Sequence, residues 1–355
     1  MKHYLCLFFA LLALTFAACN NNEPSGDGDN TPPEPTNLTW NFDEATGTLY
    51  IYGEGEMGIT SWNKEYRRQI KKVVLPDGLT SICKYAFDAC VSLTSITIPN
   101  TVTTIGVSAF ASCNSLLSIT IPGSVESIGE RAFSSCDNLA TVKLNDGIQT
   151  IGEYAFNHCP ALKSIILPNS VRSVGKYAFC YCTALGFIGL SSSMTSIPEY
   201  FANNCSSLKS ISVPSGIKSI DDYAFWRCPA LQSVSLPETL KKIGKAAFRE
   251  SAITGITLPD ALTTIGDFAF DNCANLEAIE IPANVTTIGS CAFSYCPKLA
   301  TVISYPVTPP AISVNTFNHI ADNAMLYVPA ESLSLYKSSS YKWKDSFSTS
   351  NIIAL

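Results

Sequence analysis

The sequence predicts a right-handed solenoid, an elongated fold in which short coils of the chain stack along one axis. An Ala-Phe dipeptide recurs about every 23 residues. An alternation of apolar and polar residues, typical of a strand with one buried face, recurs with the same period. The composition agrees, because 46% hydrophobic and 15% charged residues can supply an extended core.

Residues 1–18 have the pattern of a signal peptide, with Lys2 followed by an apolar run that is shorter than the ~20 residues of a transmembrane helix. Ala17 and Ala18 stand directly before Cys19. This arrangement resembles a bacterial lipobox, although Phe16 occupies the position where that pattern usually has leucine. The resemblance implies a lipid on Cys19, and the alternative is ordinary cleavage after an alanine with a soluble product.

Residues 19–37 are rich in Pro, Gly, Asp and Asn and cannot bury a core, so we expect a flexible tether behind the lipid. Its acidity resembles the export signal of surface lipoproteins, which favours an outer-membrane lipoprotein at the cell surface over one on the periplasmic face. Residues 38–70 are predicted to form an N-terminal β cap. In it Trp40 and Phe42 pair with Leu49, Ile51 and Tyr52 across a turn.

Residues 71–304 contain about ten repeats. Their phenylalanines are Phe87, Phe110, Phe133, Phe156, Phe179, Phe201, Phe225, Phe248, Phe270 and Phe293. In the unit around Ser95, Ile96 and Ile98 alternate with polar residues and predict a strand whose isoleucines point inward. Gly106 is predicted to supply a tight turn, and the Ala-Phe-x-x-Cys stretch a short helical or 3₁₀ turn whose Phe fills the interior.

The unit reads I-G-x-x-A-F-x-x-C-x-x-L-x-x-I-x-I-P, as in Ile105 to Pro122. It resembles the BspA-like leucine-rich-repeat family of bacterial surface proteins, and residues 305–355 resemble that family's C-terminal cap. The resemblance implies an α/β leucine-rich-repeat solenoid, rich in β structure and capped at both ends. It also implies binding without chemistry, because members are described as adhesins or surface proteins of unknown ligand.

The recurring cysteines raise the question of a metal site. They are Cys90, Cys113, Cys136, Cys159, Cys182, Cys205, Cys228, Cys273 and Cys296, with Ser251 at the same place in one unit. A metal site needs pairs of ligands that converge on one point, whereas these residues are strung along a line. We therefore expect buried, unbridged thiols and no metal. Cys83, Cys180 and Cys291 lie outside this series and have no predicted role.

Nothing in the sequence points to an enzyme or a cofactor. His158 and His319 are the histidines beyond the signal peptide, and both fall in predicted turns. There is no phosphate loop or zinc-protease motif, and adjacent carboxylates such as Asp221 and Asp222 are common on surfaces. A net charge of −6, with one short basic group at residues 67–72, excludes a nucleic-acid footprint.

Two surfaces are candidate binding sites. The first is a column of tyrosines, Tyr154, Tyr177, Tyr200 and Tyr223, spaced at 23 residues. It would serve as a platform for a sugar chain, or it would only cover the edge of the core. The second is the outward face of the strands, where small hydroxylated residues are interrupted by Lys143, Ile166 and Phe187. These three residues would form a hot spot, raise strand propensity, or be covered by a neighbouring copy.

The sequence therefore predicts a lipid-anchored binding module. The favoured partner is a host or bacterial surface protein, such as a component of the extracellular matrix. The alternatives are capture of a glycan for a polysaccharide uptake system and a structural spacer.

Overall fold

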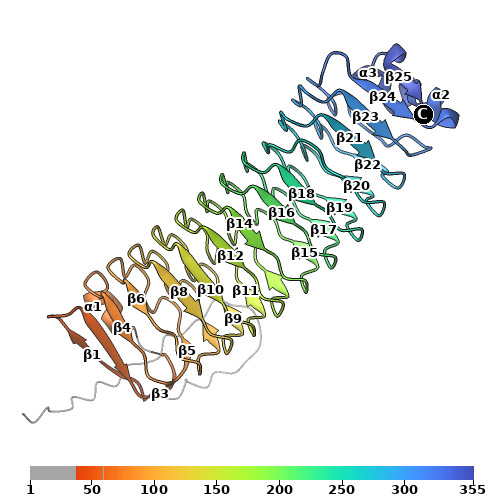
Figure 1. Cartoon of the computed structure of the whole chain (residues 1–355). Helices are drawn as coiled ribbons and strands as arrows, with labels where there is room; N and C mark the ends of the chain where they lie inside the picture. Colours follow the sequence, from red (N-terminus) through yellow and green to blue (C-terminus); the bar gives the residue numbers. More distant parts are fainter. Residues whose placement is uncertain (1–36, 59) are drawn as a thin grey trace, which may run out of the picture.

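A computed structural model, which describes residues 37–58 and 60–355, shows a parallel β-solenoid of about 13 turns. Figure 1 shows the coils stacked along one long axis, with β1 (Thr39–Asp43) at one end and the last helices at the other. The predicted right-handed leucine-rich-repeat solenoid is confirmed.

Most coils contribute a strand to a first row of parallel strands, which we call the strand face. Its members are β4 (Lys72–Val74), β6 (Ser95–Ile96), β8 (Ser118–Ile121), β10 (Thr141–Leu144), β12 (Ser164–Ile166), β14 (Phe187–Gly189), β16 (Ser210–Ser212), β18 (Ser233–Ser235), β21 (Ala278–Ile281) and β23 (Thr301–Ser304). Residues 254–258, at the equivalent place between β18 and β21, form no strand. Equivalent residues pair from coil to coil, as Ser118, Thr141 and Ser164 do. The alternation was predicted correctly: Ser95 and Thr97 are exposed, whereas Ile98 is buried.

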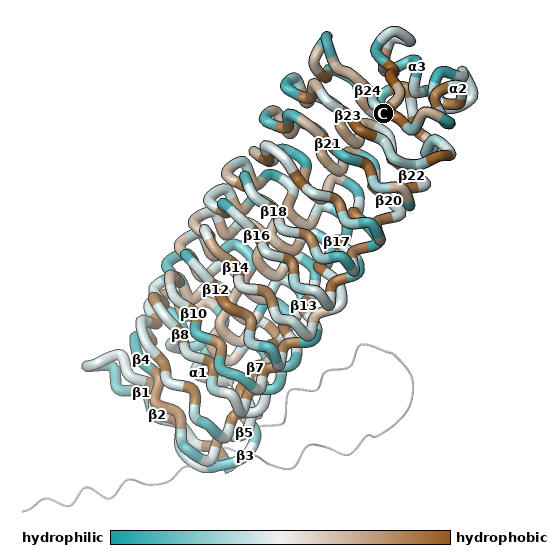
Figure 2. Tube along the Cα trace, turned by 45° about the vertical axis from the view of Figure 1, so that its right-hand side comes forward, coloured by the Kyte–Doolittle hydropathy of each residue, from teal (hydrophilic) through white to brown (hydrophobic). Residues whose placement is uncertain are grey.

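A second row runs along another side of the solenoid. It consists of β3 (Glu54–Glu56), β5 (Gly78–Ile82), β7 (Thr104–Ile105), β9 (Ser127–Ile128), β11 (Thr150–Ile151), β13 (Ser173–Val174), β15 (Ser196–Ile197), β17 (Ser219–Ile220), β19 (Lys242–Ile243), β20 (Thr264–Ile265) and β22 (Thr287–Ile288). Here Ile105 and its equivalents point inward and are buried. Figure 2 shows the hydrophobic residues recurring at corresponding points of successive coils.

Gly106 follows this second strand, but its role differs from the predicted turn. A Cβ at Gly106 would lie 2.5 Å from the amide nitrogen of Lys84 in the preceding coil. The equivalent Cβ at Gly129 would lie 2.6 Å from the carbonyl carbon of Gly106. Glycine stands at these two positions because the backbones of adjacent coils approach too closely there for a Cβ, although Pro198 and Asp221 are accommodated at the equivalent place in two other coils.

The third side of each coil, which we call the turn corner, was expected to be a short helical or 3₁₀ turn. No helix forms in the described repeats, and turn bonds alternate with bonds to the next coil instead. The amide of Asn157 donates to the carbonyl of Tyr154 at 3.0 Å, whereas the amides of Phe156 and His158 donate to the carbonyls of Ala178 and Cys180 at 2.8 Å. This alternation requires left-handed residues, with φ of 56° at Tyr154 and 57° at His158.

The phenylalanines form one buried column along the axis. Centroids of the parallel neighbouring rings lie 5.1 to 5.6 Å apart, and the column continues to Phe317. Phe201 is the exception, because the order of Phe and Ala is reversed in its coil. Its ring starts from the neighbouring backbone position and meets those of Phe179 and Phe225 at 78° and 77°. The reversal leaves the coil length at 23 residues, since Tyr177, Tyr200 and Tyr223 keep their spacing.

The N-terminal end of the solenoid is closed by an aromatic cap. β1 pairs antiparallel with β2 (Thr48–Tyr52), so that Trp40 faces Ile51 and Phe42 faces Leu49, as predicted. The cap also contains a helix that was not foreseen, α1 (Ser61–Tyr66). Its buried Trp62 stacks on Phe87 with centroids 6.2 Å apart and begins the aromatic column.

The C-terminal end is closed by strands β24 (Met325–Val328) and β25 (Ile352–Ala354), which extend the strand face. The short helices between them are η1 (Ala330–Ser332), α2 (Leu333–Tyr336), η2 (Ser339–Tyr341), α3 (Trp343–Ser346) and η3 (Thr349–Asn351). The buried Trp343 packs on Phe317 at 5.4 Å, and its indole nitrogen donates to the carbonyl of Pro310 at 3.0 Å. The aromatic column therefore ends on a tryptophan at both caps.

Replacing Phe156 with Ala should lower the free energy of unfolding by about 3 to 5 kcal/mol, because the cavity would lie between two stacked rings in a closed coil. Urea denaturation followed by circular dichroism measures this change. Phe187→Ala is the matched control, since its ring is 50% exposed and should cost about 0.5 kcal/mol or less. Equal losses in the two variants would contradict the buried column.

Candidate binding surface

The structure brings Ile166 and Phe187 together on the strand face. Ile166 is 65% exposed and pairs with Gly189, while Phe187 is 50% exposed and pairs with Ser164. A Cβ at Gly189 would lie 3.4 Å from Cγ1 of Ile166 and 3.5 Å from Cε1 of Phe187, so both side chains border the same small space. The strand register places Lys143 one coil before Ile166 in the same column. We call Lys143, Ile166 and Phe187 the apolar patch.

The strand face is hollowed on either side of this patch. A shallow depression of about 490 Å³ lies over β6 and β8 and is lined by Ser95, Thr97, Ser118 and Thr120 among others. A second depression of about 400 Å³ begins at β18 and includes residues 254–259. Gly255 leaves open space there, because a Cβ on it would meet no atom within 4 Å. The apolar patch therefore stands between two hollows lined by hydroxyl groups.

The tyrosine column lies on the turn corner, and its rings stack on one another. Neighbouring centroids of Tyr154, Tyr177, Tyr200 and Tyr223 lie 4.6, 4.4 and 4.7 Å apart, with interplanar angles of 10° or less. The guanidinium of Arg131 covers the outer face of Tyr154 at 4.5 Å, and Lys245 Nζ lies 5.6 Å from the Tyr223 ring. The ring faces are thus occupied by neighbouring rings and by cations at the two ends.

Crowding of the stack also changes the acidity of its hydroxyls. Burial, together with the neighbouring Tyr200 and Tyr154, raises the pKa of Tyr177 to about 12. Burial likewise raises the pKa of Tyr200. These hydroxyls remain protonated at neutral pH and offer donors and acceptors at the ring edges, while the flat faces on which a sugar ring would stack are covered.

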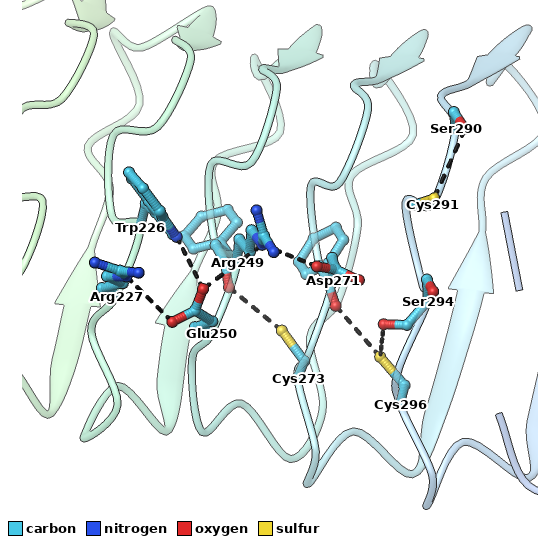
Figure 3. Close-up of polar contacts among 12 residues, drawn as sticks. Trp226, Arg227, Arg249, Glu250, Asp271, Cys273, Ser290, Cys291, Ser294 and Cys296 are labelled. Atoms are coloured by element: carbon cyan, nitrogen blue, oxygen red, sulfur yellow. Dashed lines mark hydrogen bonds and ion pairs between the residues drawn. The ribbon is translucent and has the colours of Figure 1, made fainter. Parts of the chain in front are cut away.

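Beyond Tyr223 the turn corner continues as a network of charged side chains, shown in Figure 3. Trp226 Nε1 donates to Glu250 Oε1 at 3.2 Å, and the guanidinium of Arg227 lies over the Trp226 ring at 4.7 Å. Arg249 Nε lies 2.8 Å from Oδ2 of the buried Asp271. Burial raises the pKa of Asp271, although Arg249 acts in the opposite direction. The network links three successive coils where one repeat, from Phe248 to Phe270, is a residue short.

The recurring cysteines lie inside the turn corner as free thiols. From Cys113 to Cys296, each Sγ donates to a carbonyl one coil earlier at 3.1 to 3.3 Å. Ser251 takes the same place and contacts Cys273 Sγ at 3.2 Å, so a small side chain with one donor suffices. Burial raises the pKa of Cys228 to about 12 and that of Cys273 to about 11, which keeps both thiols protonated and unreactive at neutral pH.

The residues without a predicted role also have defined places in the turn corners. Cys180 is buried and its Sγ donates to Asn203 Oδ1 at 3.3 Å, while Asn203 in turn donates to the carbonyl of Trp226. Cys83 and Cys291 are partly exposed. His158 and His319 stack on Tyr181 and Tyr295 with centroids 5.7 and 4.4 Å apart.

The described residues contain neither a cluster of metal ligands nor a membrane-spanning helix. No group of three or more His, Cys, Asp or Glu side chains in residues 37–58 and 60–355 is placed to hold a metal ion. No helix in the same ranges is long and apolar enough to cross a membrane. Cys19 and the signal peptide lie outside the described residues.

Comparison with known proteins agrees with the repeat geometry. The family model for the BspA-type leucine-rich-repeat region matches this chain in six copies, over residues 65–186, 103–232 and 195–324. The chain belongs to this family. A leucine-rich-repeat protein from Bacteroides ovatus has 29% identity and a TM-score of 0.63, over 82% of this chain and 77% of that one. The pneumococcal vaccine antigen PcpA has 23% identity and a TM-score of 0.51, over 80% of this chain and 79% of that one, and shares the fold. Among curated proteins the comparison found no match.

In this BspA-type chain, sequence reasoning missed three features around the candidate surfaces. The first is Gly189, whose lack of a side chain lets Ile166 and Phe187 border one space. The signal was a glycine directly after Ile166 and before Ser212 in the same outward column. The second is the pair of cations that end the tyrosine stack, and the third is the charged network at the short repeat. Each depends on which coils are neighbours at the same position, so it becomes visible only once the register is fixed.

Raising the pH should destabilise the protein through its buried thiols. In the unfolded chain a thiol ionises near pH 8.5, whereas burial raises the pKa of Cys90 and Cys228 to about 12. The folded state therefore holds these protons more tightly, and its stability, complete below pH ~8.5, falls as the pH rises toward 12. Each such thiol contributes about 1.4 kcal/mol per pH unit in this window.

The thermal midpoint at pH 7.5 and at pH 10 measures this effect. A variant with Cys205→Ser and Cys228→Ser should lose less on going to pH 10, because serine does not titrate there and Ser251 already occupies an equivalent position. Identical losses in the two proteins would rule out the thiols as the cause.

Proposed function

We propose that this bacterial leucine-rich-repeat protein is an outer-membrane lipoprotein, displayed at the cell surface, whose strand face binds a protein partner. The observation that carries the proposal is the apolar patch. Ile166 and Phe187 expose 65% and 50% of their surface in adjacent coils of a face whose outward residues are mostly serine and threonine, with Leu117 and several charged residues among them. Adjacent exposed apolar side chains on a polar surface are typical of binding hot spots.

The setting of the patch supports recognition of a protein. The two hydroxyl-lined hollows on either side give an extended partner polar contacts beyond its central anchor. Protein interfaces usually have an apolar centre surrounded by a polar rim, and the patch with its hollows has this arrangement. The parallel strands beneath hold the patch rigidly, because Ile165 and Ile188 between the outward residues are buried.

Capture of a glycan by the tyrosine column is the second candidate, and the stacking disfavours it. A sugar ring packs on the flat face of an aromatic side chain, and in this column those faces contact other tyrosines, Arg131 or Lys245. The hydroxyl edges support the other interpretation, in which the tyrosines cover the border of the core. A role as a structural spacer would leave the exposed apolar pair without a use.

A glycan array beside a panel of host extracellular-matrix proteins tests the proposal. We expect binding on the protein panel, and replacing Ile166 and Phe187 with Ser should weaken it by about 2 kcal/mol or more without moving the thermal midpoint. The matched control is Val307→Ser with Val314→Ser, which removes two side chains of 55% and 51% exposure elsewhere. Retention of full affinity by the patch variant would show that another surface binds.

Membrane attachment is tested by replacing Cys19 with Ala. The variant should leave the membrane fraction, because the proposed thioether-linked lipid would have no attachment point. Protease treatment of intact cells, with the wild-type protein as reference, then reports whether the solenoid faces outward. Unchanged membrane retention of the variant would contradict lipidation.

A further inference from the structure

Three lysines lie in or beside the apolar patch, and no carboxylate occupies an outward position of the strand face between β8 and β18. Each coil of the strand face presents three outward residues, and between β8 and β18 the charged ones are Lys143, Lys163 and Lys209. All three are exposed. Lys163 and Lys209 lie in the coils on either side of Gly186 and Phe187, and the amide of Gly186 donates to the carbonyl of Lys163 at 3.0 Å. We call these residues the lysine triad.

The triad places three positive charges on one face of a chain that is acidic as a whole. The whole chain carries a net charge of −6, yet in the described residues none of the three ammonium groups lies within 4.0 Å of a carboxylate oxygen. On the turn corner, by contrast, Lys176 Nζ contacts Glu199 Oε2 at 2.7 Å. Lys218, Lys241 and Lys242 on the second row also have no ion pair in the described residues, so the distinguishing feature of the triad is its place beside the exposed apolar pair, where its positive charge is complementary to acidic groups of a partner.

The glycines near Phe187, Gly186 and Gly189, also support binding of a partner at this face. A Cβ at Gly186 would have no neighbour closer than 3.7 Å, and one at Gly189 would make ordinary contacts of 3.4 Å and longer. Packing therefore does not require glycine at either position, unlike Gly106. The absence of a side chain at Gly189 leaves a space bordered by Ile166 and Phe187 that a side chain of a partner could enter.

We propose that the strand face binds an acidic segment of its partner protein, in which an apolar side chain enters the space beside Phe187 while flanking carboxylates meet the lysine triad. This inference rests on the proposed protein-binding function and adds the chemistry of the partner. The favoured class is a peptide and not an anionic polysaccharide, because the aliphatic Ile166 and the space at Gly189 suit an apolar side chain that leaves water.

The probe is a synthetic peptide of alternating Glu and Leu with a central Phe, titrated by fluorescence anisotropy against the full chain. A second peptide replaces every Glu with Lys, and a third replaces Leu and Phe with Ser. We expect the acidic apolar peptide to bind, and to bind less tightly at about 500 mM than at about 50 mM salt, since exposed charges are screened. The other two peptides should bind at least about tenfold more weakly.

The chain offers a matched control for charge. The variant Lys143→Gln, Lys163→Gln, Lys209→Gln should weaken peptide binding at least about tenfold and flatten its salt dependence. The variant Lys218→Gln, Lys241→Gln, Lys242→Gln removes the same charge from exposed lysines on the second row of strands and should leave binding unchanged. Equal effects of the two triple variants would overturn the inference, because only net charge would then matter.

Phe187→Ser separates this inference from the function on which it rests. If Phe187→Ser abolishes binding of the partner found on the protein panel and the triad variant does not alter it, the strand face binds protein and the proposed role of acidic groups is wrong. If neither variant alters it, both proposals fail.

Binding of dextran sulfate through the triad without binding of the acidic peptide would also overturn the inference. A dimer that Glu277→Gln with Glu280→Gln dissociates, again without peptide binding, would identify a second copy as the occupant and overturn it too.

Discussion

The hydrogen bonds between coils are the constraint on which the rest of the structure depends. Along both rows of strands and along the turn corner, amides of one coil bond to carbonyls of the next. These bonds form only when equivalent residues stay in register, which fixes the coil at about 23 residues. Phe201 shows how strictly this holds, because its coil exchanges the order of Phe and Ala and keeps its length.

Register has a consequence for every side chain, since each residue stacks on its equivalents in the coils before and after it. Apolar rings gain from this stacking, as the Phe column and the tyrosine stack show. Small neutral donors tolerate it, as the thiols do by bonding to a carbonyl in the preceding coil. Opposite charges also gain from it, as Lys176 does by pairing with Glu199 one coil later. Each column of equivalent residues can therefore be assessed by whether its neighbouring side chains stack, form hydrogen bonds or form ion pairs.

Much of the fold could be predicted from sequence because the period fixes the register. The inward isoleucines, the Phe column and the pairing of Trp40 with Ile51 all follow from spacing and alternation. The conformation of the turn corner did not follow. Its alternating bonds place Tyr154 and His158 in the left-handed region, which propensity assigns to Gly and Asn, and contacts with the next coil override that preference. The role of Gly106 was missed for a related reason, since it depends on the distance between coils.

The candidate site could be predicted only in part, because the repeat consensus holds the coils together and departures from it are the places where function can reside. Some departures from the repeat consensus are compensated by contacts within the chain. The short repeat after Phe248 has Ser251 in place of cysteine, and the Arg249 to Asp271 ion pair links it to the next coil. The departures at Ile166, Phe187 and the lysine triad are not compensated by contacts in the described residues. The apolar side chains remain exposed, and the ammonium groups form no ion pair with a carboxylate. The proposal that the strand face contacts another molecule rests on these departures, which are not compensated within the described residues. This distinction, more than the exposure of any single residue, singles out the strand face.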